Sequence, residues 1–163
     1  MQPCSVDRSR RRLMAGALAA VPLLAGLTGC APSPMPLAEA TATYDAAVAD
    51  TVAALDLELL TDEDRPALQE RDSDCVYYPA ALELEAPDGT DLRGSAERLA
   101  PVLAEHGFGA PEPHDAPGGW SGLISEDDHG ATLTVLRSTD VAVVAVEAPV
   151  DPGDLACDDT SLA

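Results

Sequence analysis

Four cysteines are the residues most able to do chemistry in this chain, because a thiol can be acylated, oxidised or used as a ligand or nucleophile. Cys4 lies in a basic N-terminal stretch, and Cys30 directly follows an apolar run. Cys75 and Cys157 lie far apart in the acidic sequence that makes up the rest of the chain. The chemistry open to each thiol therefore depends on the segment that carries it.

The segment before Cys30 has the composition of an export signal. Its positive charges are four arginines, Arg8, Arg10, Arg11 and Arg12. They precede an almost wholly apolar run from Leu13 to Leu27. That run is about 15 residues long, whereas a membrane-spanning helix needs roughly 20. These proportions predict a cleaved secretory signal.

The end of the run, Leu27-Thr28-Gly29-Cys30, resembles the lipobox of bacterial lipoprotein signal peptides. In that family the cysteine thiol receives a diacylglyceryl group and a signal peptidase cuts just before it, here between Gly29 and Cys30. The resemblance implies a signal peptide over residues 1–29, which removes Cys4, and acyl chains such as palmitate on Cys30. Two or three such chains would hold the protein permanently on the outer face of the cell membrane, because each buried CH₂ contributes about 0.8 kcal/mol.

The arginine cluster leaves the export route open. Ser9-Arg10-Arg11-Arg12-Leu13-Met14 resembles a twin-arginine signal, which would imply export in the folded state. The chain has no lysine, so a general secretory signal would carry arginines as well.

Residues 31–36 alternate proline with other, mostly small side chains, which predicts an extended tether over residues 30–36. The tether leaves residues 37–163 as a single domain. From Cys30 onward the chain has 5 arginines against 28 acidic residues, a formal charge of −23. Such a surface repels nucleic acid phosphates and anionic lipid headgroups. We therefore expect no nucleic acid partner, and a membrane attachment through lipid on Cys30.

Cys75 and Cys157 are the cysteines left after processing and acylation. An exported domain folds in an oxidising compartment, and an even number of thiols predicts one disulfide. A metal or redox pair is the alternative, but neither cysteine has CxxC spacing or a histidine close to it in the sequence.

Other residue types give no catalytic or metal-binding pattern. The histidines His106, His114 and His129 lack metal-ligand spacing, and the motifs GxSxG and SxxK are absent. Acidic pairs fall in predicted loops, with weak calcium binding at Asp62–Asp64 or Glu126–Asp128 as an alternative. We therefore expect no metal, no cofactor and no catalytic residue. Trp120 is the best candidate for a recognition residue, because it enters a strand beside two glycines, and its alternative role is a core anchor.

Periodicity predicts two helices and four strands. Apolar residues recur at helical spacing over 37–60, and Ser95 is a suitable N-cap for a helix ending at His106. Residues 66–71 are expected to form a turn or one helical turn, and residues 107–119 a loop. Alternating patterns predict strands at 75–86, 120–126, 131–138 and 141–150. The order α-β-α-β-β-β indicates an α+β fold: a four-stranded, mainly antiparallel sheet with both helices packed on one face.

Two of these strands carry further information. Pro79 lacks the N–H that a ladder hydrogen bond needs, so its strand should lie at an edge or contain a bulge there. The strand at 141–150 is apolar on both faces, which predicts a central strand or one covered on both sides. Cys75 and Cys157 flank the first and last strands, so they meet if those strands run antiparallel.

The processed chain also resembles a group of small actinobacterial lipoproteins of uncharacterised function. The shared features are a leading helix, a cysteine opening the first strand, Gly119-Trp120 entering a three-stranded meander, and a second cysteine past the last strand. That group implies no activity. The hypothesis is therefore an exported, membrane-anchored, non-catalytic module that binds a protein or small molecule. The alternative is a cell-wall-acting enzyme, or an accessory factor or inhibitor of one, that uses loop carboxylates.

Removing the acylated thiol tests the export assignment. Cys30→Ala should release the protein into the medium or leave an uncleaved precursor, because neither acylation nor cleavage before residue 30 can then occur. Cell fractionation and intact-mass measurement distinguish these products. Normal attachment of the variant to the membrane would contradict the lipoprotein assignment.

Overall fold

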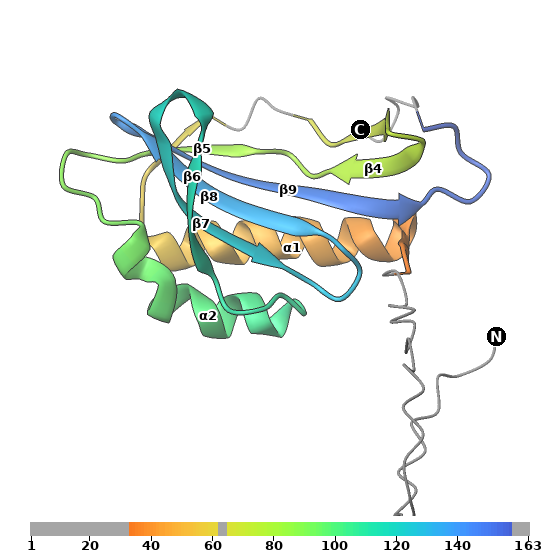
Figure 1. The fold of residues 1–163 in the computed structure, drawn as a ribbon, viewed down its shortest axis with the longest axis horizontal. Coiled ribbons are helices and arrows are strands. Elements are labelled where there is room, and N and C mark those ends of the chain that lie inside the picture. The colour runs from red at the N-terminus through yellow and green to blue at the C-terminus, as the bar shows by residue number, and fades with distance from the viewer. Residues whose placement is uncertain (1–32, 62–64, 158–163) are drawn as a thin grey trace, which may run out of the picture. The chain divides into compact units, whose positions relative to one another are not determined.

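One long strand, β9 (Val141–Asp151), forms the middle of the sheet in the computed structural model of the chain (Figure 1). The structure describes residues 33–61 and 65–157, so the predicted signal peptide, the Gly29–Cys30 cleavage site and the acylated thiol lie outside the described residues. Within these ranges two α-helices and nine strands form an α+β fold with a mainly antiparallel sheet. The predicted fold class is confirmed, and the predicted number of four strands is wrong.

Strands pair with β9 along both of its edges. The remaining strands are β1 (Met35–Pro36), β2 (Leu59–Thr61), β3 (Ala67–Arg71), β4 (Asp74–Tyr78), β5 (Leu82–Glu85), β6 (Glu112–Ala116), β7 (Trp120–Glu126) and β8 (Thr132–Ser138). One edge of β9 pairs with β8, followed outward by β7 and β6. The other edge pairs with β5 and then β4, which carry β2 and β3 on their far sides. β1, in residues that the sequence assigns to the tether, pairs in parallel with the end of β9.

The core lies between one face of this sheet and the two helices, α1 (Leu37–Leu55) and α2 (Ala96–Glu105) (Figure 1). Side chains alternate between the faces of a strand, so every second residue of β9 points toward the helices. Those residues are all buried: Ala142, Val144, Val146, Ala148 and Val150. The prediction that both helices pack on one face is confirmed.

Two buried tyrosines attach α1 to the sheet through their hydroxyl groups. The Tyr77 hydroxyl of β4 donates to Asp45 of α1 at 2.7 Å. The Tyr44 hydroxyl of α1 donates to Asp127, in the turn between β7 and β8, at 2.6 Å. Burial, reinforced by the hydrogen bond to a carboxylate, raises the pKa of both Tyr44 and Tyr77 above the usual range. Both phenols therefore stay protonated and keep donating at physiological pH.

Pro79 divides the strand predicted at 75–86 into β4 and β5. Both pieces pair with β9, but the register shifts by one residue between Cys75↔Val150 and Glu85↔Val141. One extra residue is therefore accommodated around Pro79, where the backbone has no N–H to donate. The predicted interruption is confirmed, although β4 lies between β3 and β9 and is not an edge strand.

Three other segments differ from the prediction. The helix predicted at 37–60 ends at Leu55, because Asp56 adopts a left-handed conformation with φ of 55°. The turn predicted at 66–71 contains β3, which pairs with β4 over its whole length. The loop predicted at 107–119 contains β6, whose Pro113 is tolerated because this strand lies at the sheet edge. The last two segments contain short strands, each paired with the strand that follows it in the sequence.

The structure joins Cys75 to Cys157 in a disulfide, as the sequence predicts. The two Cα atoms lie 5.4 Å apart and are separated by 82 residues along the chain. Cys75 of β4 pairs with Val150 near the end of β9, so the antiparallel arrangement of these strands brings the two cysteines together. The bridge fastens the chain beyond β9 to the sheet.

Reduction of this disulfide should lower the free energy of unfolding by roughly 4 to 5 kcal/mol, because the unfolded chain loses a long covalent loop. Chemical denaturation of the protein with and without reductant measures the difference. A Cys75→Ala/Cys157→Ala variant should have about the same free energy of unfolding as the reduced protein. Equal unfolding midpoints for oxidised and reduced protein, or free thiols at both positions by mass spectrometry, would contradict this expectation.

Candidate functional site

The sheet face opposite the helices, named here the outer face, is not covered by any helix in the part of the chain that the structure describes (Figure 1). Strand register arranges its side chains in rows that cross the sheet. One row contains Glu83, Val143, Leu136, Gly122 and His114. The adjacent row contains Ala145, Thr134, Ile124 and Glu112. Five strands therefore contribute to one continuous surface.

The centre of the outer face is apolar. Val143, Leu136 and Ile124 are each partly exposed, whereas Val144 and Val135 on the helix-facing side are 0% and 1% exposed. Neighbouring apolar side chains that stay accessible to solvent are typical of a binding surface. The prediction that the strand at 141–150 is central is confirmed, and its second apolar face is open among the described residues instead of covered.

Gly122 bends the sheet in the middle of this surface. A Cβ atom at Gly122 would lie 1.9 Å from the backbone oxygen of Val135 in β8, which is far inside van der Waals contact. Only glycine allows β7 to approach β8 so closely, and a glycine inside a strand is typical of such a bend. In Figure 1 the hairpin of β6 and β7 rises on the side away from the helices.

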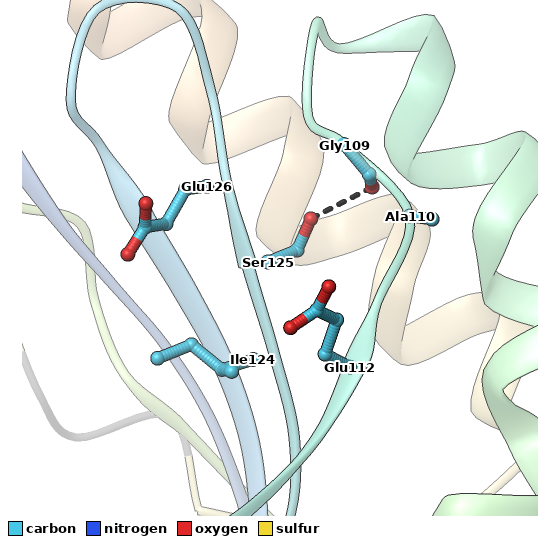
Figure 2. A pocket seen from close by; sticks show the side chains of 6 residues that line it. All are labelled: Gly109, Ala110, Glu112, Ile124, Ser125 and Glu126. Carbon is cyan, nitrogen blue, oxygen red and sulfur yellow. Dashed lines mark hydrogen bonds between the residues drawn. The ribbon is translucent and has the colours of Figure 1, made fainter.

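A cavity of about 350 Å³ opens beside the bend, at the edge of the sheet (Figure 2). It is lined by Gly109, Ala110, Glu112, Ile124, Ser125 and Glu126. Ile124 and Glu126 extend from one side of β7, whereas the Ser125 hydroxyl turns the other way and donates to the Gly109 oxygen at 2.8 Å (Figure 2). Ser125 is 4% exposed and engaged in that bond. The accessible lining thus combines the apolar side chains of Ile124 and Ala110 with the carboxylates of Glu112 and Glu126.

Trp120 lies at the start of β7 and is partly exposed. Alternation along β7 places it on the same face as Gly122 and Ile124, which is the outer face. Its indole lies beside Gly118, where an added Cβ would be 3.6 Å from the ring. Trp120 is absent from the buried core, and its role in recognition stays a prediction.

Carboxylates surround the apolar centre of the outer face. Glu83 and Glu85 on β5 are exposed on one flank, and Glu112 and Glu126 are exposed on the other. Arg71 of β3 pairs with Glu147 of β9 at the end of the sheet. Other ion pairs among the described residues join Arg93 to Asp115, His106 to Asp50 and Arg137 to Asp88. The four flanking carboxylates take part in none of these pairs.

The histidines are not brought together. His106 Nε2 lies 2.9 Å from Asp50 and links α2 to α1, and His129 Nδ1 lies 3.0 Å from the carbonyl oxygen of Ser33. His114 lies in β6 on the outer face. Residues 33–61 and 65–157 contain no group of three histidine, cysteine or acidic side chains arranged to hold a metal ion.

The acidic turn at 126–128 has a structural role. The carboxylate of Asp127 accepts hydrogen bonds from the Tyr44 hydroxyl and from the backbone N–H groups of His129 and Ala131. These three donors engage both carboxylate oxygens of Asp127 and tie the turn to α1. The other predicted calcium segment, Asp62–Asp64, lies outside the described residues.

Comparison with known proteins identifies a fold relative. No family model matches the chain, and no curated protein matches it. A crystal structure of a DUF4853 family protein from Actinomyces odontolyticus is similar, with 19% sequence identity and a TM-score of 0.50. The match covers 74% of this chain and 69% of that chain. At this identity the likeness shows the fold, and the actinobacterial source agrees with the resemblance seen in the sequence.

Neither helix of the described residues is long and apolar enough to cross a membrane.

Sequence reasoning did not single out Gly122, although a glycine inside an alternating strand is the usual signal for a bend. Gly122→Ala should lower the free energy of unfolding by about 1 to 3 kcal/mol, because the added methyl group overlaps the β8 backbone. Gly109→Ala is the matched control, since its Cβ would lie 3.4 Å from the Glu126 oxygen in ordinary contact. Denaturant unfolding measures both variants, and equal effects would contradict the proposed bend.

Proposed function

We propose that this chain is an exported lipoprotein whose acidic domain is a non-catalytic binding module on the outer face of the cell membrane. The observation that carries the proposal is the open outer face of the sheet. Its apolar centre, formed by Val143, Leu136 and Ile124, lies beside the partly exposed Trp120. A protein or small molecule that buried these side chains would gain the free energy of removing apolar surface from water.

The position of the chain's entry into the domain supports this role. β1, a few residues after the proposed lipid-bearing Cys30, pairs with Val150 and Asp151 at one end of β9. Val141 lies at the other end of the same strand, roughly 30 Å from Val150, because each strand residue adds about 3.3 Å. The disulfide strengthens the end where β1 enters, because Cys75 pairs with Val150. A lipid anchor near β1 would therefore leave the far part of the outer face accessible to a partner.

The catalytic alternative depends on the cavity that Glu112 and Glu126 line. Paired carboxylates do acid–base chemistry when one of them is desolvated and when a nucleophile or a held water lies between them. Both of these carboxylates are exposed, and the nearby Ser125 hydroxyl is engaged with Gly109. The geometry thus supports binding better than a cell-wall-acting enzyme.

Photocrosslinking in cells tests the binding role. A benzophenone amino acid at Val143 should give a discrete adduct with a partner, because that side chain lies in the apolar centre of the outer face. The matched control is the same residue at Ala46, which is exposed on α1. Absence of any adduct from Val143, or equal adducts from Val143 and Ala46, would contradict a binding role for this face.

A further inference from the structure

We propose that the outer face binds a cationic, amphipathic protein segment, in which lysine or arginine side chains flank apolar ones. This proposal rests on the proposed binding function and names the chemistry of the partner. It follows from the placement of charge around the apolar centre of the outer face, and not from the acidity of the chain as a whole.

The first observation is the order of side chains along the rows. Glu83, Val143 and Leu136 follow one another across β5, β9 and β8. On the other flank Glu112 pairs with Ile124. The row that begins at Glu83 ends at His114, and Glu112 ends the adjacent row. Taken over both rows, the apolar centre lies between carboxylates of β5 on one flank and of β6 on the other. A segment with the matching order of cations and apolar side chains would satisfy both kinds of contact.

The second observation is that these carboxylates have no cation of their own. Among residues 33–61 and 65–157, the ion pairs use Arg71, Arg93, Arg137 and His106, with carboxylates other than Glu83, Glu85, Glu112 and Glu126. An incoming cation would therefore gain an attractive partner without displacing an internal one. Complementary charge of this kind speeds association and excludes partners of the wrong sign.

The spacing suits a single chain segment. Four strand-to-strand steps separate β5 from β6, or about 19 Å along the sheet at the usual spacing. An α-helix with its side chains is about 10 Å across. Lysine and arginine side chains reaching to both sides would span the remainder. In Figure 1 the hairpin of β6 and β7 rises on the side of the sheet away from the helices, which is the side of the outer face.

Charge also decides against other occupants. A second copy would bring its own acidic surface, with a formal charge of −23 from Cys30 onward, and would oppose like charges on the flanks. Anionic lipid and nucleic acid are repelled in the same way. An uncharged ligand would leave the flanking carboxylates unused.

The test uses the full chain in phosphatidylcholine nanodiscs, with empty nanodiscs as the blank. The probe is a twelve-residue peptide with leucine at positions 1, 4, 5, 8 and 12 and lysine elsewhere, so that a helix presents one apolar stripe flanked by lysines. Two further peptides replace every lysine by glutamate or every leucine by serine. We expect saturable binding of the first peptide, no binding of the glutamate peptide, and binding of the serine peptide at least about tenfold weaker, because both charge and apolar contact are needed.

Matched variants locate the binding. The double substitution Glu83→Gln/Glu85→Gln should raise the Kd for the lysine–leucine peptide by about tenfold, because it removes the charge of one flank. Glu97→Gln/Glu105→Gln, on exposed positions of α2, removes the same charge and should change the Kd by less than about twofold. Thermal unfolding of each variant checks that the fold is retained.

Equal weakening by the two double variants would mean attraction by overall charge and would overturn the proposal. A serine peptide that binds as tightly as the leucine peptide would overturn it as well. A dimer of the chain that is lost in Val143→Asp would assign the outer face to a second copy. An adduct from Val143 to a partner segment without basic residues would leave the proposed function standing and reject this inference. Absence of any adduct in cells would reject the proposed function and, with it, the inference that rests on it, even if the peptide binds in vitro.

Discussion

The unequal burial of the two faces of β9 is the constraint on which the rest of the structure depends. Both faces carry apolar side chains, but the helices cover only one of them among the described residues. Val144 and Val146 are buried against α1, and Val141 and Val143 stay partly exposed. Because β9 is hydrogen-bonded along both edges, its orientation in the sheet is fixed, and the helices can cover only one of its two faces. An open apolar face is therefore built into the topology.

The elements around β9 keep that face open and give it a shape. The tyrosine hydroxyls of Tyr44 and Tyr77 hold α1 on the opposite side through buried hydrogen bonds to carboxylates. The disulfide strengthens the end at which the chain enters the domain. Gly122 lets β7 approach β8 closely beside the apolar centre of the outer face. These features together present a rigid surface, which suits binding better than a chemical step that needs convergent groups.

Local patterns predicted the parts of this fold that local physics determines. The division of β9 into two apolar faces, the hairpin turns, the disulfide and the two helices all follow from periodicity, composition and compartment. The short strands β2, β3 and β6 were not predicted from local pattern. β2 pairs with β5, which is distant in the sequence, whereas β3 and β6 each pair on one side only and lack a clear alternation of apolar and polar residues. The candidate site was predicted only through Trp120. Its apolar centre depends on which face of β9 the helices cover, and periodicity alone does not specify that choice.

Solvent accessibility of methyl groups tests this account most directly. Relaxation of the valine and leucine methyl signals by a soluble gadolinium chelate can be measured on the full chain in nanodiscs. The account predicts strong relaxation for Val141, Val143 and Leu136, and little for Val144 and Val146, which are 0% and 1% exposed. Equal protection of Val143 and Val144 would show that the outer face is covered, and would contradict the claim that it is the binding surface.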